Sequence, residues 1–287
     1  MTRFSWAAAV LLAAALTPAS PAAAADRFSF ANGCYAATDP AGKPVAEKVR
    51  MKPTSLGRYL LYLPDGRFVA AGEDGSLGAA AQPSPAADLA VEDAGDGLFT
   101  LTPASTDAPV ATVRFAKADG CAEFPEAPLN ATGSVRRSST EYSEVDGIVE
   151  GHMHWMAFQY FGGRFHCGAP WHAYGIAHAL PDCSEVEGPG GTAAPFQNLL
   201  NYGNPGQPHD TSGYPKLTEW RRDNLTYDGV YYRWVERVWK AGLRLMVMGV
   251  NENRVLCELQ TNRIYDCNEM NTMRRGFKAI RQLQDYV

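Results

Sequence analysis

The chain has 287 residues, of which 46% are apolar and 20% charged, a balance typical of a folded globular protein and not of a disordered one. Its 26 basic and 31 acidic residues give a net charge of −5, so the sequence gives no electrostatic support for nucleic-acid binding. Its arginine pairs, Arg136-Arg137 and Arg274-Arg275, are isolated and form no stripe that would follow a phosphate backbone.

Residues 1–25 have the features of a secretory signal peptide. Arg3 supplies the positive start, residues 7–16 are apolar, and Ala23-Ala24-Ala25 provide a small-residue cleavage site. The apolar part is too short to span a bilayer, and no later stretch is apolar enough. We therefore expect an exported chain, secreted or periplasmic, with no membrane span and enough residues for two domains.

Six cysteines in an exported chain indicate disulfides, although six allow fifteen pairings. The order of the cysteines favours one bridge that clasps the first domain and two local ones. The alternative for Cys167 is metal ligation together with His166 or His172. The favoured pairing is Cys34 with Cys121, Cys167 with Cys183, and Cys257 with Cys267.

Residues 26–126 show the signals of β-structure. Strand-like runs at 58–63 and 67–71 flank Pro64-Asp65-Gly66, in which proline and glycine suit a turn. Similar runs at 89–92, 98–101 and 110–115 follow at regular spacing. We expect an all-β accessory domain, a trefoil first or else a small barrel, that has a role either in packing or in ligand binding.

Residues 127–144 are predicted to be a linker because they contain proline, glycine and a run of serine and arginine. A second domain, residues 145–287, follows. Its first run, 145–154, is a strand-like segment that ends in His152-Met153-His154. Since alternate side chains of a strand share a face, the two imidazoles are expected on one face, as two ligands of one metal ion.

The stretch 155–217 is rich in glycine, proline, histidine and aromatic residues and shows no regular period. A loop of this length is typical of a functional region, so His166 and His172 are candidate substrate-pocket residues. His178 and His209 are weaker candidates. The glycine-rich run 188–192 does not open a helix, which argues against a phosphate loop.

Order returns near residue 227. Apolar residues from 230 to 239 recur at helical spacing, Gly242 suits a helix end, and residues 243–250 form an apolar run expected of a parallel strand covered by helices. The strand, helix and strand make a βαβ unit. Asn251 then lies at the sheet edge that carries the histidines and is a third candidate pocket residue.

This pattern of a strand, His-x-His, a helix and a second strand resembles the opening of the amidohydrolase superfamily. The runs Phe161–Pro170, Asp182-Cys183 and Gly188–Thr192 resemble a secreted bacterial branch of it. The resemblance covers roughly residues 142–287 and implies a TIM barrel and metal-dependent hydrolysis. On this reading His152 and His154 bind a divalent ion, zinc first, that activates water against an amide, ester or related bond of a small-molecule or peptide-like substrate.

An amphipathic helix is expected from Met273 to Val287. A (β/α)₈ barrel needs about 250 residues, and residues 145–287 offer only two legible strand and helix units. We therefore expect the first βα units of a truncated barrel, in a chain that is inactive by itself because the family's other ligands have no counterpart. The alternative is a smaller α/β domain that only resembles the opening of the barrel. The alternative function is a non-enzymatic exported binding protein whose β-domain recognises a glycan or a cell-surface ligand; the oligomeric state stays open.

Overall fold

The computed structural model describes residues 26–135, 144–164, 166–217 and 231–287. The expected signal peptide, the Arg136-Arg137 pair and the first residue of the helix expected from residue 230 lie outside these ranges. Within them, no helix is both long and apolar enough to cross a membrane.

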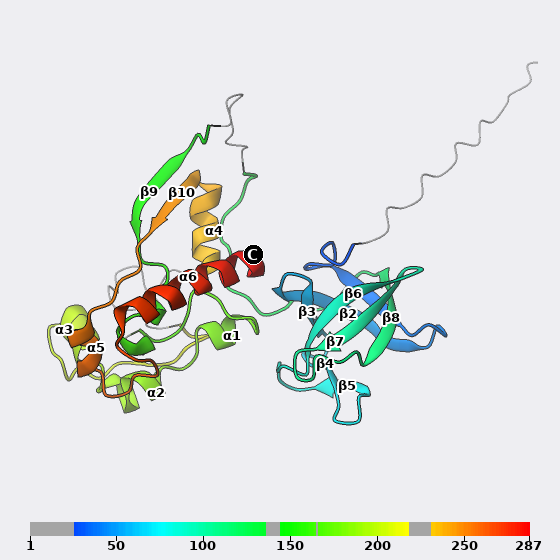
Figure 1. Cartoon of the computed structure of the whole chain (residues 1–287), viewed down its shortest axis with the longest axis horizontal. Helices are drawn as coiled ribbons and strands as arrows, with labels where there is room; N and C mark the ends of the chain where they lie inside the picture. The colour runs from blue at the N-terminus through cyan, green and yellow to red at the C-terminus, as the bar shows by residue number, and fades with distance from the viewer. Residues whose placement is uncertain (1–25, 136–143, 165, 218–230) are drawn as a thin grey trace, which may run out of the picture.

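The N-terminal part is a closed antiparallel β-barrel with a hairpin attached (Figure 1). The strands pair in the order β2-β1-β8-β7-β6-β3, and β3 pairs again with β2, so six strands close into a ring. Strands β4 and β5 extend the sheet from β3. The eight strands are β1 (Cys34–Thr38), β2 (Pro44–Ser55), β3 (Arg58–Tyr62), β4 (Phe68–Ala71), β5 (Leu77–Ala80), β6 (Asp88–Gly95), β7 (Leu98–Pro103) and β8 (Ala111–Lys117).

Alternating side chains of these strands build the core of the barrel. Phe30 is fully buried and its ring contacts the rings of Tyr35 and Phe99 edge to face. The expected turn is present: Leu63 N–H donates to the Arg67 carbonyl, and Gly66 has a φ of 84°. The small barrel predicted as one alternative is therefore the form observed, and the strand order shows no three repeated units of a trefoil.

The C-terminal part is built on two parallel strands, β9 (Ile148–Met153) and β10 (Leu243–Met248), with helix α4 (Tyr232–Lys240) before β10. Helix α6 (Glu269–Tyr286) packs on one face of this ribbon, where Met153, Met246 and Met248 join a cluster with Trp155 and Leu283. The parallel pair expected from the sequence is thus present. The remaining elements are η1 (Ala157–Gln159), η2 (Phe161–Gly163), α1 (Ile176–Ala179), α2 (Ser184–Glu187), η3 (Pro189–Gly191), α3 (Pro195–Tyr202) and α5 (Arg254–Leu259).

Two expectations about this part need correction. The strand from residue 243 was expected to be covered on both faces, but Leu245 and Val247 are 52% and 53% exposed, because only the face with the methionines is covered by α6. The parallel sheet has two strands within the described ranges, and these residues give no sign of a TIM barrel.

The barrel and the C-terminal part touch through aromatic and polar contacts. Lys52 on β2 donates a hydrogen bond to the Tyr286 hydroxyl on α6 at 2.9 Å. Tyr174 packs against a barrel cluster that includes Leu60 and Phe68. Residues 127–129 of the expected linker also contact α4, where Arg237 donates to two of their carbonyls. The longest-range of these contacts, between Lys52 and Tyr286, joins residues 234 positions apart.

All three disulfides favoured by the cysteine order are present: Cys34–Cys121, Cys167–Cys183 and Cys257–Cys267. The alternative of metal ligation by Cys167 is wrong, because its sulfur is bonded to that of Cys183 and carries no thiolate charge.

Candidate metal centre

The two histidines meet at the C-terminal end of β9. His152 lies in the strand and is exposed, and His154 follows directly after the strand ends. Their Nε2 atoms are 2.6 Å apart, and their rings meet edge to face with centroids 4.6 Å apart. The sequence prediction that both side chains converge on one side is therefore confirmed.

Tyr160 fixes the orientation of the His154 ring. The 3₁₀ turn η1 brings the tyrosine back toward the strand end, and its hydroxyl donates to the Gly249 carbonyl at 2.6 Å. That donation uses the single hydroxyl proton, so the oxygen can only accept from His154 Nδ1, 3.3 Å away. His154 is thereby assigned the Nδ1–H tautomer, which leaves a lone pair on Nε2 facing His152.

This tautomer is the one that a metal-ligating histidine needs. A second hydrogen-bonding group commonly holds the far nitrogen of such a ligand, and Tyr160 is such a group for His154. Two nitrogens about 2.05 Å from one tetrahedral zinc ion lie about 3.3 Å apart. The observed 2.6 Å is shorter, so the rings must separate by about 0.7 Å to hold an ion, and the exposed side chain of His152 has room to move.

A third protein ligand is harder to find. No group of three or more histidine, cysteine, aspartate or glutamate side chains suited to a metal occurs among the described residues. Glu150 is the nearest carboxylate along the strand, and its Oε1 accepts the His152 backbone N–H at 2.9 Å. The described residues therefore supply two nitrogen ligands for an ion at this pair.

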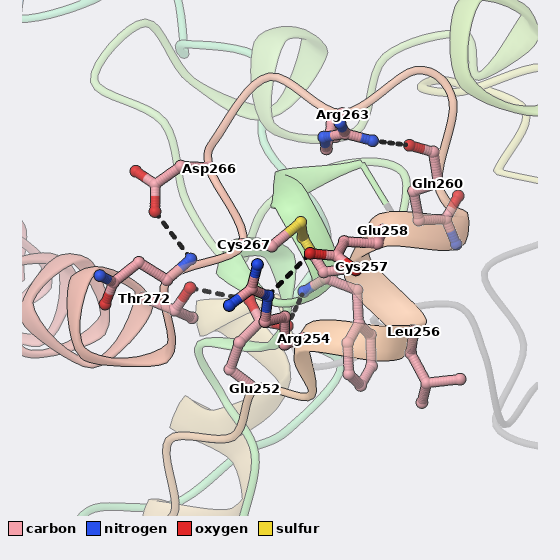
Figure 2. Close-up of a disulfide and its surroundings, with 12 residues drawn as sticks. Glu252, Arg254, Leu256, Cys257, Glu258, Gln260, Arg263, Asp266, Cys267 and Thr272 are labelled. Atoms are coloured by element: carbon pink, nitrogen blue, oxygen red, sulfur yellow. Dashed lines mark hydrogen bonds and ion pairs between the residues drawn. A yellow bond between two sulfur atoms is a disulfide. The ribbon is translucent and has the colours of Figure 1, made fainter.

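Glu252 lies beyond β10 but is committed to holding the fold together. Its Oε1 accepts from the backbone N–H groups of Phe161 and Asn253, and its Oε2 accepts from the Thr272 hydroxyl at 2.7 Å. Figure 2 shows this carboxylate beside the start of α5, next to the Cys257–Cys267 disulfide. It ties the strand end to α6 and keeps the neighbouring turn in place.

Asn251 is exposed three residues after β10, at the end of the ribbon where His154 lies. Gly249 explains why this end is tight: a Cβ there would lie 3.1 Å from the His154 ring. The role of Asn251 in a substrate pocket stays a prediction.

The other predicted pocket histidines lie in separate surroundings. Burial lowers the pKa of His166 to about 4, and its Nδ1 is buried. Burial and the nearby His178 lower the pKa of His172 to about 4, and His172 Nδ1 accepts the Tyr174 N–H at 3.0 Å while its ring stacks on that of His178. Both rings are held neutral near pH 7, and their assignment to a substrate pocket stays a prediction.

His209 forms a buried pair with Glu187. Its Nε2 lies 2.9 Å from Glu187 Oε2, and both side chains are almost fully buried. The ring packs so closely on Gly191 that a Cβ there would lie 2.3 Å from its Cε1. The Glu187 pair and the contact with Gly191 hold the ring in place, and the assignment of His209 to substrate contacts stays a prediction.

Tyr160 was not among the site residues predicted from the sequence, and neither was the polar cluster of Glu126, Tyr231 and Tyr232 between the domains. No spacing rule links Tyr160 to His154, because the contact depends on η1 and on a carbonyl 89 residues further along the chain. The second omission is Glu126, whose Oε2 accepts from the hydroxyls of Tyr231 and Tyr232 at 3.0 and 2.8 Å. The adjacent tyrosines at the start of α4 were the one feature of the sequence that could have indicated a buried polar partner there.

Comparison of the chain with protein-family models, with curated proteins and with solved structures found no match.

Proposed function

We propose that this protein is exported and has metal-dependent hydrolase chemistry, with His152 and His154 as ligands of a divalent ion, zinc first. The observation that carries the proposal is the convergence of the two Nε2 atoms, with the His154 tautomer assigned by Tyr160. The three disulfides support export to an oxidising compartment.

When bound at this pair, a divalent ion supplies Lewis acidity toward a carbonyl or related oxygen and lowers the pKa of water. The protein's own contribution is positional. Tyr160 and the Gly249 carbonyl hold the His154 ring, and Glu150 fixes the backbone at His152. Asn251, at the same sheet end, is proposed to donate to or accept from a small-molecule or peptide-like substrate.

Zinc titration by calorimetry tests this proposal. The full chain is expected to take up one equivalent with modest affinity, since a catalytic zinc ion usually has three protein ligands and this pair supplies two. His152→Ala and His154→Ala should each weaken uptake at least tenfold. His178→Ala is the matched control, because that histidine is exposed and its ring contacts lie with His172 and Tyr174.

Equal zinc uptake by the native chain and the double alanine variant would reject the assignment. Because an ion with two protein ligands is held loosely, we expect no measurable turnover of p-nitrophenyl acetate by this chain with zinc. Metal-dependent turnover that disappears in His154→Ala would support the hydrolase and contradict that expectation.

A further inference from the structure

A cleft of about 860 Å³ lies between the barrel and the helices of the C-terminal part, and neither His152 nor His154 lines it. One wall comes from β2 and from the turn that precedes β1, and the other from α4 and the C-terminal end of α6. Figure 1 shows the end of α6 next to the barrel, and the contacts between α6 and β2 agree with that view. The volume is within the range of about 300–1,000 Å³ that is typical of small-molecule sites.

Exposed aromatic rings line this cleft from both sides. Phe28 from the barrel side is 41% exposed, and Trp239 from α4 is 46% exposed. Trp155 and Tyr232 extend the aromatic surface deeper into it. Flat, partly exposed rings on two facing domains are suited to the apolar faces of a ring-shaped ligand that also carries polar groups.

The charges in the cleft largely cancel, which argues against an ionic ligand. Arg50 is paired with Glu123, and Arg233 with Glu236, all of them lining residues. The remaining lining charges include Lys52 and the acidic Glu126 and Asp285. A phosphate, a polyanion or a polycation would therefore meet groups of both signs in one small volume.

Hydrogen-bonding capacity remains along these walls. The Lys52 side chain is buried, and its ammonium group donates to the Pro53 carbonyl and to the Tyr286 hydroxyl, which uses two of its three N–H groups. The side-chain amides of Asn32 and Gln284 also line the cleft, and neither makes a hydrogen bond within the part of the chain that the structure describes. These groups can donate to and accept from hydroxyl groups.

We propose that this interdomain cleft binds a neutral oligosaccharide. Sugar rings have apolar faces that stack on aromatic side chains and hydroxyl edges that bond to amides, ammonium groups and carboxylates, which is the combination present here. The site draws residues from both domains, so it differs from a glycan site on the β-domain alone. Sugar binding in this cleft does not require the metal ion proposed at His152 and His154.

The test is calorimetric titration of the full, disulfide-bonded chain with three neutral hexasaccharides: β-1,4-linked glucose, β-1,4-linked N-acetylglucosamine and α-1,4-linked glucose. At least one is expected to bind and to change tryptophan fluorescence. Trp239→Ala should weaken binding at least tenfold and Gln284→Ala severalfold. Phe277→Ala is the matched control, because this exposed aromatic residue of α6 does not line the cleft and its loss should leave affinity unchanged.

Three outcomes would overturn the proposal. The first is the absence of binding by all three hexasaccharides. The second is unchanged affinity in Trp239→Ala; because Trp239 is exposed, this variant is expected to fold. The third is binding of hexagalacturonate or of an acidic peptide in place of the neutral sugars, which would show an ionic site. Urea unfolding of each variant confirms that lost binding is not lost folding.

Discussion

At the residue scale, the histidine pair shows what spacing can and cannot predict. Two histidines one residue apart on a strand must share a face, and their Nε2 atoms do converge. The tautomer of His154 depends on Tyr160 and on the carbonyl of Gly249, which follows β10. Contacts that join such distant parts of the chain have no local sequence pattern, so the orientation of the His154 ring is not predictable from the sequence.

Tyr160→Phe tests the orienting role of the tyrosine. The variant keeps the ring but loses the hydroxyl that holds His154, so zinc affinity should fall about 10- to 100-fold, as is typical when the partner of a metal-ligating histidine is removed. Calorimetric titration measures the change. The free energy of unfolding should fall by only about 1 kcal/mol, from the lost hydrogen bond to Gly249.

Tyr174→Phe is the matched control. This tyrosine packs at the barrel interface, and the histidines that its ring contacts are His172 and His178, not His152 and His154. Zinc affinity should be unchanged in it. Unaltered zinc binding by Tyr160→Phe would show that the hydroxyl packs beside His154 without orienting it.

At the element scale, the strands and helices with strong local signals were predictable. The turn Pro64-Asp65-Gly66 separates β3 from β4, and the apolar period before Gly242 matches α4. The stretch from 155 to 217 was not predictable in detail, because it contains only short helices of three to eight residues, whose stability comes from tertiary contacts. Exposure of Leu245 was missed for a related reason: an apolar run does not show which of its faces a neighbour covers.

The disulfides at this scale are expected to differ in their effect on stability. Cys34–Cys121 spans 87 residues, and Cys257–Cys267 spans 10. In the chain-entropy model these loops correspond to about 4.5 and about 3 kcal/mol. The short loop, closed by the disulfide drawn in Figure 2, also leads into α6, whose start is already capped by the Asn268 side chain.

Replacing both cysteines of each bridge by alanine, in separate variants, should therefore cost more for the long bridge. Urea unfolding, followed by circular dichroism, measures the two losses. An equal or larger loss from the short bridge would mean that packing around Cys257, which is fully buried, dominates over loop entropy.

At the scale of the whole molecule, the interface between the barrel and the C-terminal part is what the sequence did not reveal. Lys52 occurs in an ordinary strand pattern, yet it is 7% exposed and its ammonium group lies over the rings of Phe124 and Tyr286. Glu126 ends the predicted β-domain, yet it accepts hydrogen bonds from Tyr231 and Tyr232 at the start of α4. Contacts between distant segments of the chain determine the surroundings of Lys52 and Glu126. No local pattern in the sequence predicts such contacts.

Lys52 gives this interface a pH dependence that can be measured. Burial lowers its pKa from 10.5 to about 8, opposed by the nearby Glu126. The unfolded chain therefore holds more protons than the folded chain between about pH 8 and 10.5, so the contribution of Lys52 to stability rises with pH in that window. Burial raises the pKa of Tyr286, and it raises the pKa of Tyr59 to about 12. Ionisation of these two tyrosines therefore lowers stability only above about pH 10.

Lys52→Met removes the titrating group and keeps most of the packing volume. Urea unfolding at pH 7 and pH 9.5 should show the native chain gaining about 2 kcal/mol relative to this variant, from a pKa difference of about 2.5 units sampled over part of its range. Lys48→Met, at an exposed position of the same strand, should show no such change. A difference between the native chain and Lys52→Met that stays constant from pH 7 to 9.5 would mean that the ammonium group remains charged at the interface. Glu126 and the rings of Phe124 and Tyr286 would then stabilise it more strongly than burial destabilises it.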